Sequence, residues 1–113
     1  MEQPIATLSL LGRLANSQQE FLVQVSLGQP YSRDNGSWAC PVELKGIHDR
    51  VADIVGDDSL QALCLAVQFA GRLLAAFVHR GGRLRNSGDD PEDSFPLEAY
   101  FGGTGSSPAG GAA

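Results

Sequence analysis

The side chains of this 113-residue chain that could act as nucleophiles or bind metals are few and scattered. Cys40 and Cys64 both fall on apolar faces, the first of a predicted strand and the second of a predicted helix. A redox or metal role would need a second ligand at a suitable spacing, and the sequence contains no CxxC or HxxxH pair. We therefore expect two buried, inert thiols, and the sequence predicts no metal and no other cofactor.

The two histidines, His48 and His79, are the candidates for acid–base chemistry. A general base needs a nucleophile within reach and a carboxylate to orient it, and the spacing in the sequence supplies neither. His79 falls in the last turn of the predicted helix, where an imidazolium interacts favourably with the helix dipole. Capping or solvation is the expected role of both histidines, and no catalytic residue is predicted.

Four aspartates precede the predicted helix and could hold a divalent cation or assist hydrolysis. They are Asp49, Asp53, Asp57 and Asp58. Their spacing lacks the alternating oxygen ligands of a calcium-binding loop. We expect a solvated edge with negative charge at the helix start, and recognition of a basic partner is the alternative.

Three arginines, Arg80, Arg83 and Arg85, follow the helix and could bind a phosphate or a carboxylate. The acidic residues between positions 89 and 93 come soon enough after them to neutralise them within the chain. The pair Gly81-Gly82 follows a helix, whereas a phosphate-binding loop precedes one. The sequence therefore favours a charge patch that is satisfied by the chain itself.

One long helix, predicted over residues 60–80, organises the rest of the chain. It would be about 32 Å long at about 1.5 Å per residue. Its strongly polar side chains share one narrow stripe, so the helix must be buried on about three sides. The stripe comprises Gln61, Gln68, Arg72 and His79. A membrane span is the alternative, and it is disfavoured because Arg72 and Gln68 would lie near the bilayer centre.

Both ends of this helix carry sequence signals. Asp58 or Ser59 is predicted to be the N-cap, and Asp58 with Gln61 approximates a capping box. Gly81-Gly82 supplies a residue that can adopt a positive φ at the carboxyl end.

Strands are predicted over residues 5–14, 20–27 and 37–47. Leu8, Leu10 and Leu14 share one face of the first strand, and the second strand alternates most clearly.

The third strand contains Pro41, which cannot donate a ladder hydrogen bond, so we expect this strand at a sheet edge or with a bulge. Residues 48–57 are predicted to form a fourth, irregular strand, with a single helical turn as the alternative. Residues 82–86 are predicted to add a short edge strand.

The apolar face of these strands and the broad apolar face of the helix must both be buried, and each can be buried by packing against the other. The sequence therefore predicts an α+β fold of two layers, in which an antiparallel β-meander of three to four strands packs against one long α-helix. This single domain is expected to span residues 1–101. Residues 102–113 are rich in Gly, Ser and Ala and are expected to form a disordered tail.

Two short motifs resemble those of a bacterial family of small proteins that is known only as a domain of unknown function. The first is the Trp-x-Cys-Pro strand at Trp38, Cys40 and Pro41. The second opens the helix as Gly-x-Asp-x-x-Gln-Ala-Leu, at Gly56, Asp58 and Gln61. The resemblance covers roughly residues 5–86 and departs at Asn86, where the family often has an aromatic residue. It implies a compact α+β domain and no particular activity.

The net charge of −5 argues against nucleic acid as a partner, because such binding needs a coherent basic surface. The N-terminus lacks the basic and apolar regions of a secretory signal, so reduced thiols and a cytoplasmic location are the default expectation.

The expected function is that of a small non-enzymatic protein-interaction module, either a homodimer or a partner of another protein. The helix is too apolar for one sheet to cover, and we expect an interface at Leu65, Phe69, Gly71 and Ala75. The alternative for this surface is that residues 87–101 cover it. The alternative function is a small-molecule-binding or catalytic domain with a pocket between helix and sheet, near Trp38, Tyr31 and Arg72.

Overall fold

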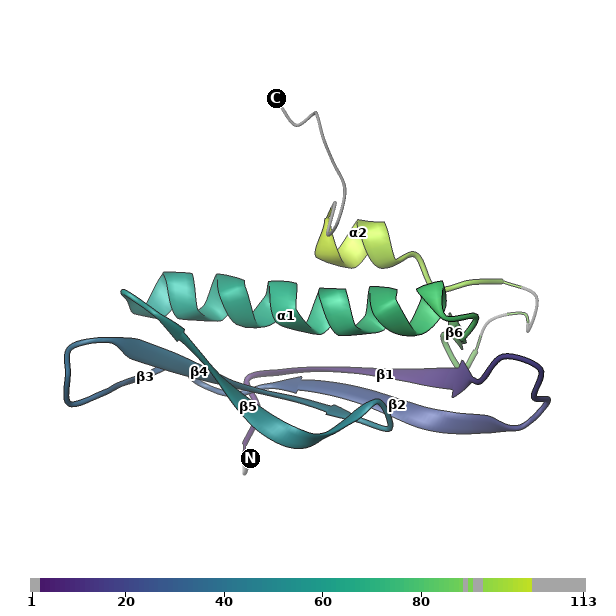
Figure 1. Cartoon of the computed structure of the whole chain (residues 1–113), viewed down its shortest axis with the longest axis horizontal. Helices are drawn as coiled ribbons and strands as arrows, with labels where there is room; N and C mark the ends of the chain where they lie inside the picture. The colour runs from purple at the N-terminus through teal and green to yellow at the C-terminus, as the bar shows by residue number, and fades with distance from the viewer. Residues whose placement is uncertain (1–2, 89, 91–92, 103–113) are drawn as a thin grey trace.

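The computed structural model describes residues 3–88, 90 and 93–102, and shows an antiparallel sheet packed against one long helix (Figure 1). The elements in chain order are β1 (Ala6–Arg13), β2 (Glu20–Leu27), β3 (Tyr31–Ser32), β4 (Trp38–Lys45), β5 (His48–Gly56), α1 (Ser59–His79), β6 (Arg83–Arg85) and α2 (Leu97–Phe101). The predicted α+β fold is confirmed, with six strands in place of three to four. Of the predicted tail, residues 102–113, only Gly102 is described, as the C-cap of α2, and the rest lies outside the described residues.

The sheet follows the order β3-β4-β2-β1-β6, and β5 pairs with the other edge of β4. β3 comes after a break at residues 28–30 and pairs with the beginning of β4, whereas β2 pairs with its end. β2 and β3 together therefore form one neighbour of β4, and β5 forms the other. β4 is an interior strand, so the strand that contains Pro41 is not at an edge; the alternative, a bulge, agrees with the register shift between Val42 and Leu44 in its pairing with β5.

The core forms where the alternating apolar faces of the strands meet α1. The strands contribute the buried side chains Leu10, Val23, Val25, Cys40, Val42 and Leu44. α1 contributes Ala62, Ala66, Ala70, Leu74 and Phe77. The three alanines are four positions apart, so small side chains follow one another along the helix and let its backbone approach the sheet closely.

Leu14 does not join this core, although its spacing from Leu8 and Leu10 predicted that it would. β1 ends at Arg13, and Leu14 is 59% exposed in the turn that follows. The turn places Asn16 at a φ of 62°, which breaks the alternation of the strand.

β5 is the predicted fourth strand, and its irregularity is a register shift opposite Val42 and Leu44. Its last residue, Gly56, pairs with Trp38 and is buried against the first turn of α1. A Cβ at Gly56 would lie 2.6 Å from the backbone nitrogen of Ala62. Glycine is therefore required here by close approach of two backbones.

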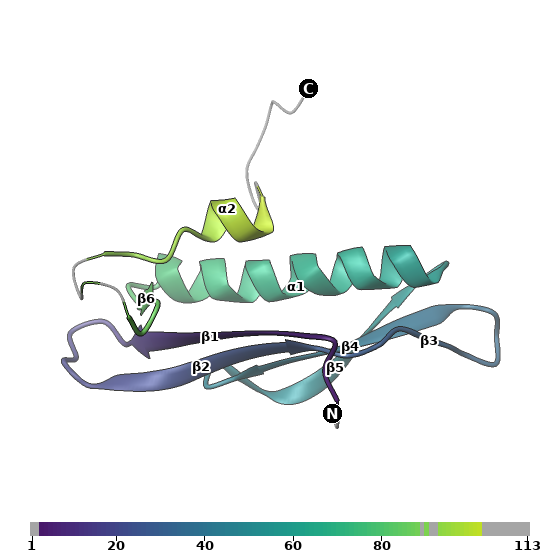
Figure 2. The same ribbon diagram turned by 180° about the vertical axis from the view of Figure 1, so that it is seen from behind.

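The chain beyond α1 returns to the sheet and then to the helix. β6 pairs with β1 through Leu84 and Gly12, and the backbone N–H of Phe95 donates to the carbonyl of Leu84 at 2.8 Å. Phe95 is buried, and α2 lies along α1 on the side away from the sheet (Figures 1 and 2). The C-terminal segment therefore covers part of α1. This agrees with the alternative prediction that residues 87–101 pack over the apolar surface of the helix.

We predict that Gly56→Ala destabilises the protein by about 2 kcal/mol or more, because the added methyl meets backbone that cannot move without shifting α1. Gly88→Ala is the matched control, because nothing lies within 4 Å of a Cβ at that position. Urea unfolding monitored by circular dichroism measures both variants. Equal midpoints for the two would contradict the close approach of β5 to α1.

Candidate functional site

Cys40 fills a gap that Pro41 leaves in the sheet. The N–H of Gly28 donates to the carbonyl of Pro41 at 2.8 Å, so these residues face each other as a hydrogen-bonded antiparallel pair. The second bond of such a pair would run from residue 41 to the carbonyl of Gly28, and proline has no N–H. The Cys40 thiol donates to that carbonyl instead, with an Sγ···O distance of 3.4 Å.

This thiol is suited to donating a hydrogen bond and not to nucleophilic chemistry. Cys40 is buried, and burial raises the pKa of its thiol, with a further contribution from the negative charge of Asp53. The proton therefore stays on sulfur at neutral pH, where a thiolate would be needed for reactivity. The Cys-Pro pair is a structural device that lets a proline occupy an interior strand.

The helix start is a second structural device, and it lies beside the first. The Asp58 carboxylate accepts from the Gln61 N–H at 2.7 Å, and the Gln61 side-chain oxygen accepts from the Asp57 N–H at 2.6 Å. Asp58 is the N-cap, and Ser59 is the first residue of α1. Because Trp38 pairs with Gly56, the two motifs that carry the family resemblance are adjacent in space.

The remaining candidates for chemistry are dispersed. The ring of His48 packs edge-on against Phe69 with centroids 6.1 Å apart, and His79 is exposed in the last turn of α1. Cys64 is exposed, so the expectation that it is buried was wrong. It lies in the first half of α1, whereas α2 covers the second half (Figure 1). Among the described residues, no group of three His, Cys, Asp or Glu side chains could hold a metal ion.

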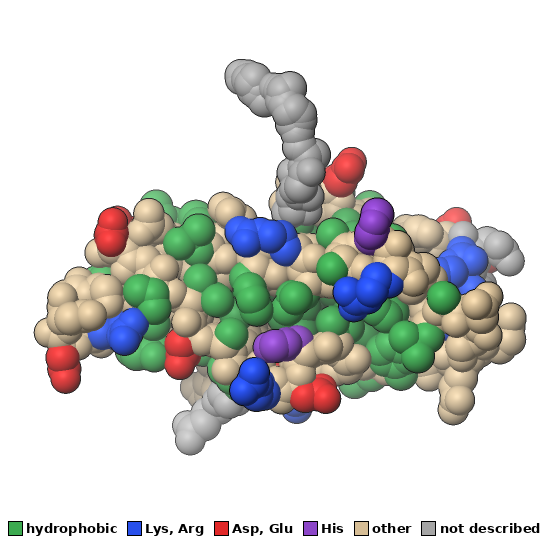
Figure 3. All heavy atoms as spheres, in the orientation of Figure 1, with side chains coloured by type: hydrophobic (Ala, Val, Ile, Leu, Met, Phe, Trp, Pro, Cys, Tyr) green, Lys and Arg blue, Asp and Glu red, His purple; other side chains and the backbone are tan. Residues whose placement is uncertain are grey.

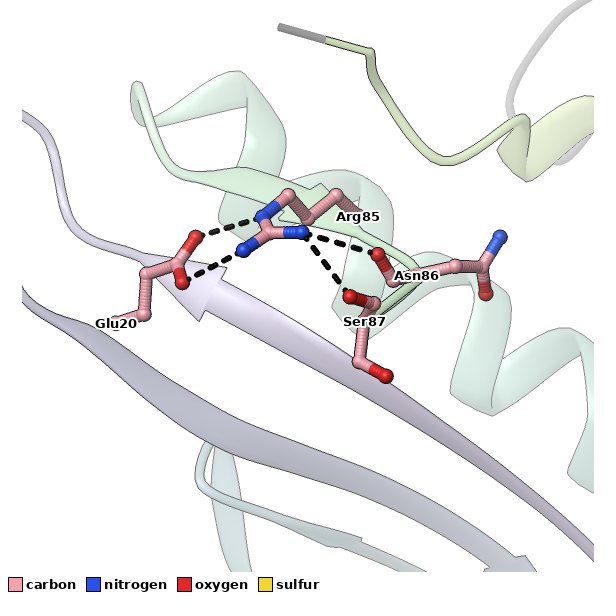
Figure 4. Close-up of polar contacts among 4 residues, drawn as sticks. All are labelled: Glu20, Arg85, Asn86 and Ser87. Atoms are coloured by element: carbon pink, nitrogen blue, oxygen red, sulfur yellow. Dashed lines mark hydrogen bonds and ion pairs between the residues drawn. The ribbon is translucent and has the colours of Figure 1, made fainter. Parts of the chain in front are cut away.

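One arginine of the basic cluster, Arg85, is paired with a residue that sequence spacing did not reveal. Arg85 makes a bidentate ion pair with Glu20 at the start of β2, with N···O distances of 2.8 and 2.9 Å (Figure 4). This hydrogen bonding lowers the pKa of the Glu20 carboxyl. The expected acidic partners were those at positions 89–93, of which Asp93 lines the shallow depression around this pair. The depression holds about 10 Å³, room for roughly one water and not for a phosphate.

The expected interface residues lie on two different flanks of α1. At about 100° per residue, the side of the helix with Gly71 and Ala75 is rotated by about 120° from the side with Leu65 and Phe69. Gly71 is buried and Ala75 half-buried. The other flank lies above β5, because Phe69 contacts His48.

We call this second set, Leu65, Phe69, Leu73 and Ala76, the open flank. All four side chains are half-buried, and Phe69 and Leu73 pack against the edge of the core while remaining partly exposed. Figure 3 views the side of the molecule on which β5 is nearest, and hydrophobic side chains gather along its middle, between α1 and β5. Leu73 and Ala76 were missing from the expected interface, although their helical spacing from Leu65 and Phe69 was the signal for them.

The structure does not assemble the pocket expected near Trp38, Tyr31 and Arg72. Tyr31 pairs with Ala39, so its side chain lies on the face of the sheet that points away from α1. Arg72 belongs to α1 and therefore lies on the other side of the sheet. An apolar hollow of about 190 Å³ lies elsewhere, between the end of α2 and the first two strands. It is lined by Ala6, Thr7, Leu8, Val25, Leu27, Tyr100 and Phe101. This volume is below the range of roughly 300–1,000 Å³ that is typical of small-molecule sites.

The fold and these two motifs define a small α+β domain with structural devices at β4 and at the start of α1. The chain belongs to a family characterised by a domain of unknown function (DUF6968), which matches residues 12–97. The matched region begins at residue 12, later than the predicted residue 5, and runs past the predicted limit of 86 to include Phe95. No curated protein and no solved structure matches the chain.

We predict that Asp58→Ala lowers the free energy of unfolding by about 1 kcal/mol, the usual cost of losing an N-cap side chain. Asp58→Asn keeps an acceptor at this position and should lose much less. Ser59→Ala is the matched control and should leave stability nearly unchanged, because Ser59 is already helical. A denaturation midpoint that is insensitive to Asp58→Ala, or that falls equally in Ser59→Ala, would contradict this assignment.

Proposed function

We propose that this protein is a non-enzymatic interaction module that binds another protein chain through the open flank of α1. The observation that carries the proposal is the apolar surface that the chain itself leaves uncovered. Its four side chains are apolar, and the strands and α2 leave each of them partly exposed. Contiguous apolar surface of this kind marks interaction sites in soluble proteins.

The distribution of reactive groups supports binding over catalysis. Cys40 is committed to the carbonyl of Gly28, and Arg85 is committed to Glu20. His48 contacts an aromatic ring, and His79 lies at the far end of α1. Catalysis needs several such groups to converge on one reacting atom, and these four are on separate parts of the described chain.

The net charge and the exposed thiol indicate which kind of partner and which cellular compartment to expect. A net charge of −5 disfavours nucleic acid as the partner. Cys64 is a free, exposed thiol, which suits a reducing compartment, so we place the protein in the cytoplasm.

A photo-crosslinking amino acid at Leu65 tests the proposal in the organism that makes the protein. We expect a discrete adduct from position 65, because this side chain is part of the open flank and is half-buried, so a label there can reach a bound partner. The same label at Leu22 is the matched control, because Leu22 is 56% exposed on the opposite face of the sheet. We expect the adduct to disappear when Phe69→Glu is added.

Absence of a discrete adduct at position 65, or equal labelling from position 22, would contradict the proposed function. The mass of the adduct also identifies the kind of partner. Twice the mass of the chain indicates self-association, and any other discrete mass indicates a different protein.

A further inference from the structure

We propose that the partner of the open flank is a second copy of this chain, docked with α1 antiparallel to α1 about a two-fold axis at Phe69. This inference rests on the proposed function and adds the identity and the register of the partner. It is carried by a symmetry in the residues that share this side of the helix.

The residues on this side are spaced identically in both directions from Phe69. The apolar pair is Leu65 and Leu73, four positions before and after it, and the charged pair is Asp58 and Arg80, eleven positions before and after it. At about 100° per residue Leu65 and Leu73 fall within roughly 40° of Phe69 around the helix axis, and Asp58 and Arg80 are the caps at the two ends of the helix. Phe69 is also the midpoint of α1, which runs from Ser59 to His79.

A two-fold axis at Phe69 brings each of these residues against the one equally far on the other side. Phe69 meets itself, and Leu65 meets Leu73 of the second copy. Asp58 and Arg80 lie eleven positions before and after Phe69, so the acidic end of one flank meets the basic end of the other. The apolar residues therefore face apolar residues, and the two terminal charges are complementary.

The electrostatics of the helix support the same arrangement. Asp58 stands at the amino end of α1 and Arg80 is its C-cap, and both are exposed. Neither makes an ion pair within the part of the chain that the structure describes. Antiparallel docking also places the positive end of each helix dipole beside the negative end of the other. A parallel arrangement would juxtapose like charges at both ends.

The neighbouring edge of the sheet does not offer an equivalent interface. β5 is an edge strand, but its pairing with β4 is interrupted opposite Val42 and Leu44. Asp49, Arg50 and Asp53 place charges along it. Bulges and charges are features that prevent edge strands from pairing between molecules. The helix flank is therefore the surface on which the second copy docks.

Sedimentation equilibrium at micromolar concentrations tests the inference. We expect a dimer for the unmodified chain and a monomer for Phe69→Glu. Arg80→Glu replaces an attraction by a repulsion at two symmetric contacts, so we expect the dimer dissociation constant to rise about tenfold. Adding Asp58→Asn to Arg80→Glu removes the repelling carboxylate while keeping an N-cap, and should recover part of the loss.

Arg33→Glu is the matched control, because it makes the same change in net charge on the exposed turn between β3 and β4. It should leave the dissociation constant nearly unchanged. If Phe69→Glu fails to fold, Arg80→Glu still decides the question, since Arg80 is exposed and its side chain supports no described contact.

Three results would overturn the inference. One is a monomeric unmodified chain, and another is an equal effect of Arg80→Glu and Arg33→Glu. The third is a monomer that floats with phosphatidylglycerol vesicles, which would assign the open flank to lipid. A monomer that still gives a position-65 adduct with a different protein would overturn this inference and leave the proposed function intact.

Discussion

The structure depends on a mismatch between one long apolar helix and the single sheet that supports it. α1 has 21 residues and presents apolar side chains around most of its circumference. A sheet can cover only one side of a helix, and here it takes the side with Ala62, Ala66 and Ala70. α2 lies along the second half of α1, on the side away from the sheet, and Phe95 completes the core. The open flank is the apolar side of α1 that neither the sheet nor α2 covers completely.

The position of α1 is fixed at its start by two devices that share β4. Trp38 pairs with Gly56, which brings the end of β5 against the first turn of α1 without a side chain between them. Two residues further on, Cys40 supplies the hydrogen bond that Pro41 cannot make. These local devices account for the residues in both family motifs through structure alone. A role in binding therefore has to be sought outside the motifs, on surfaces that they position.

Much of this architecture could be predicted from the sequence, because local periodicity reports which face of an element is buried. The alternation of β2 and the cap at Asp58 are examples. The ion pair between Arg85 and Glu20 could not be predicted, since its partners are 65 positions apart and only the sheet order brings them together. Pro41 predicted an edge strand or a bulge, and the interior position of β4 could not be foreseen because the break between β2 and β3, which tolerates the proline, depends on tertiary structure. Leu65 and Gly71 were grouped in one interface, although helical geometry alone separates them.

The central claim, that two copies meet along the open flank in one register, is tested most directly by disulfide formation in a Cys64→Ala background. Leu65→Cys with Leu73→Cys should form a covalent dimer on oxidation, and Leu65→Cys alone should form no covalent cross-link. Within one helix these positions are about 12 Å apart, too far for a bridge inside the chain. Failure of the double variant to cross-link, or equally fast cross-linking of Leu65→Cys alone, would contradict the account.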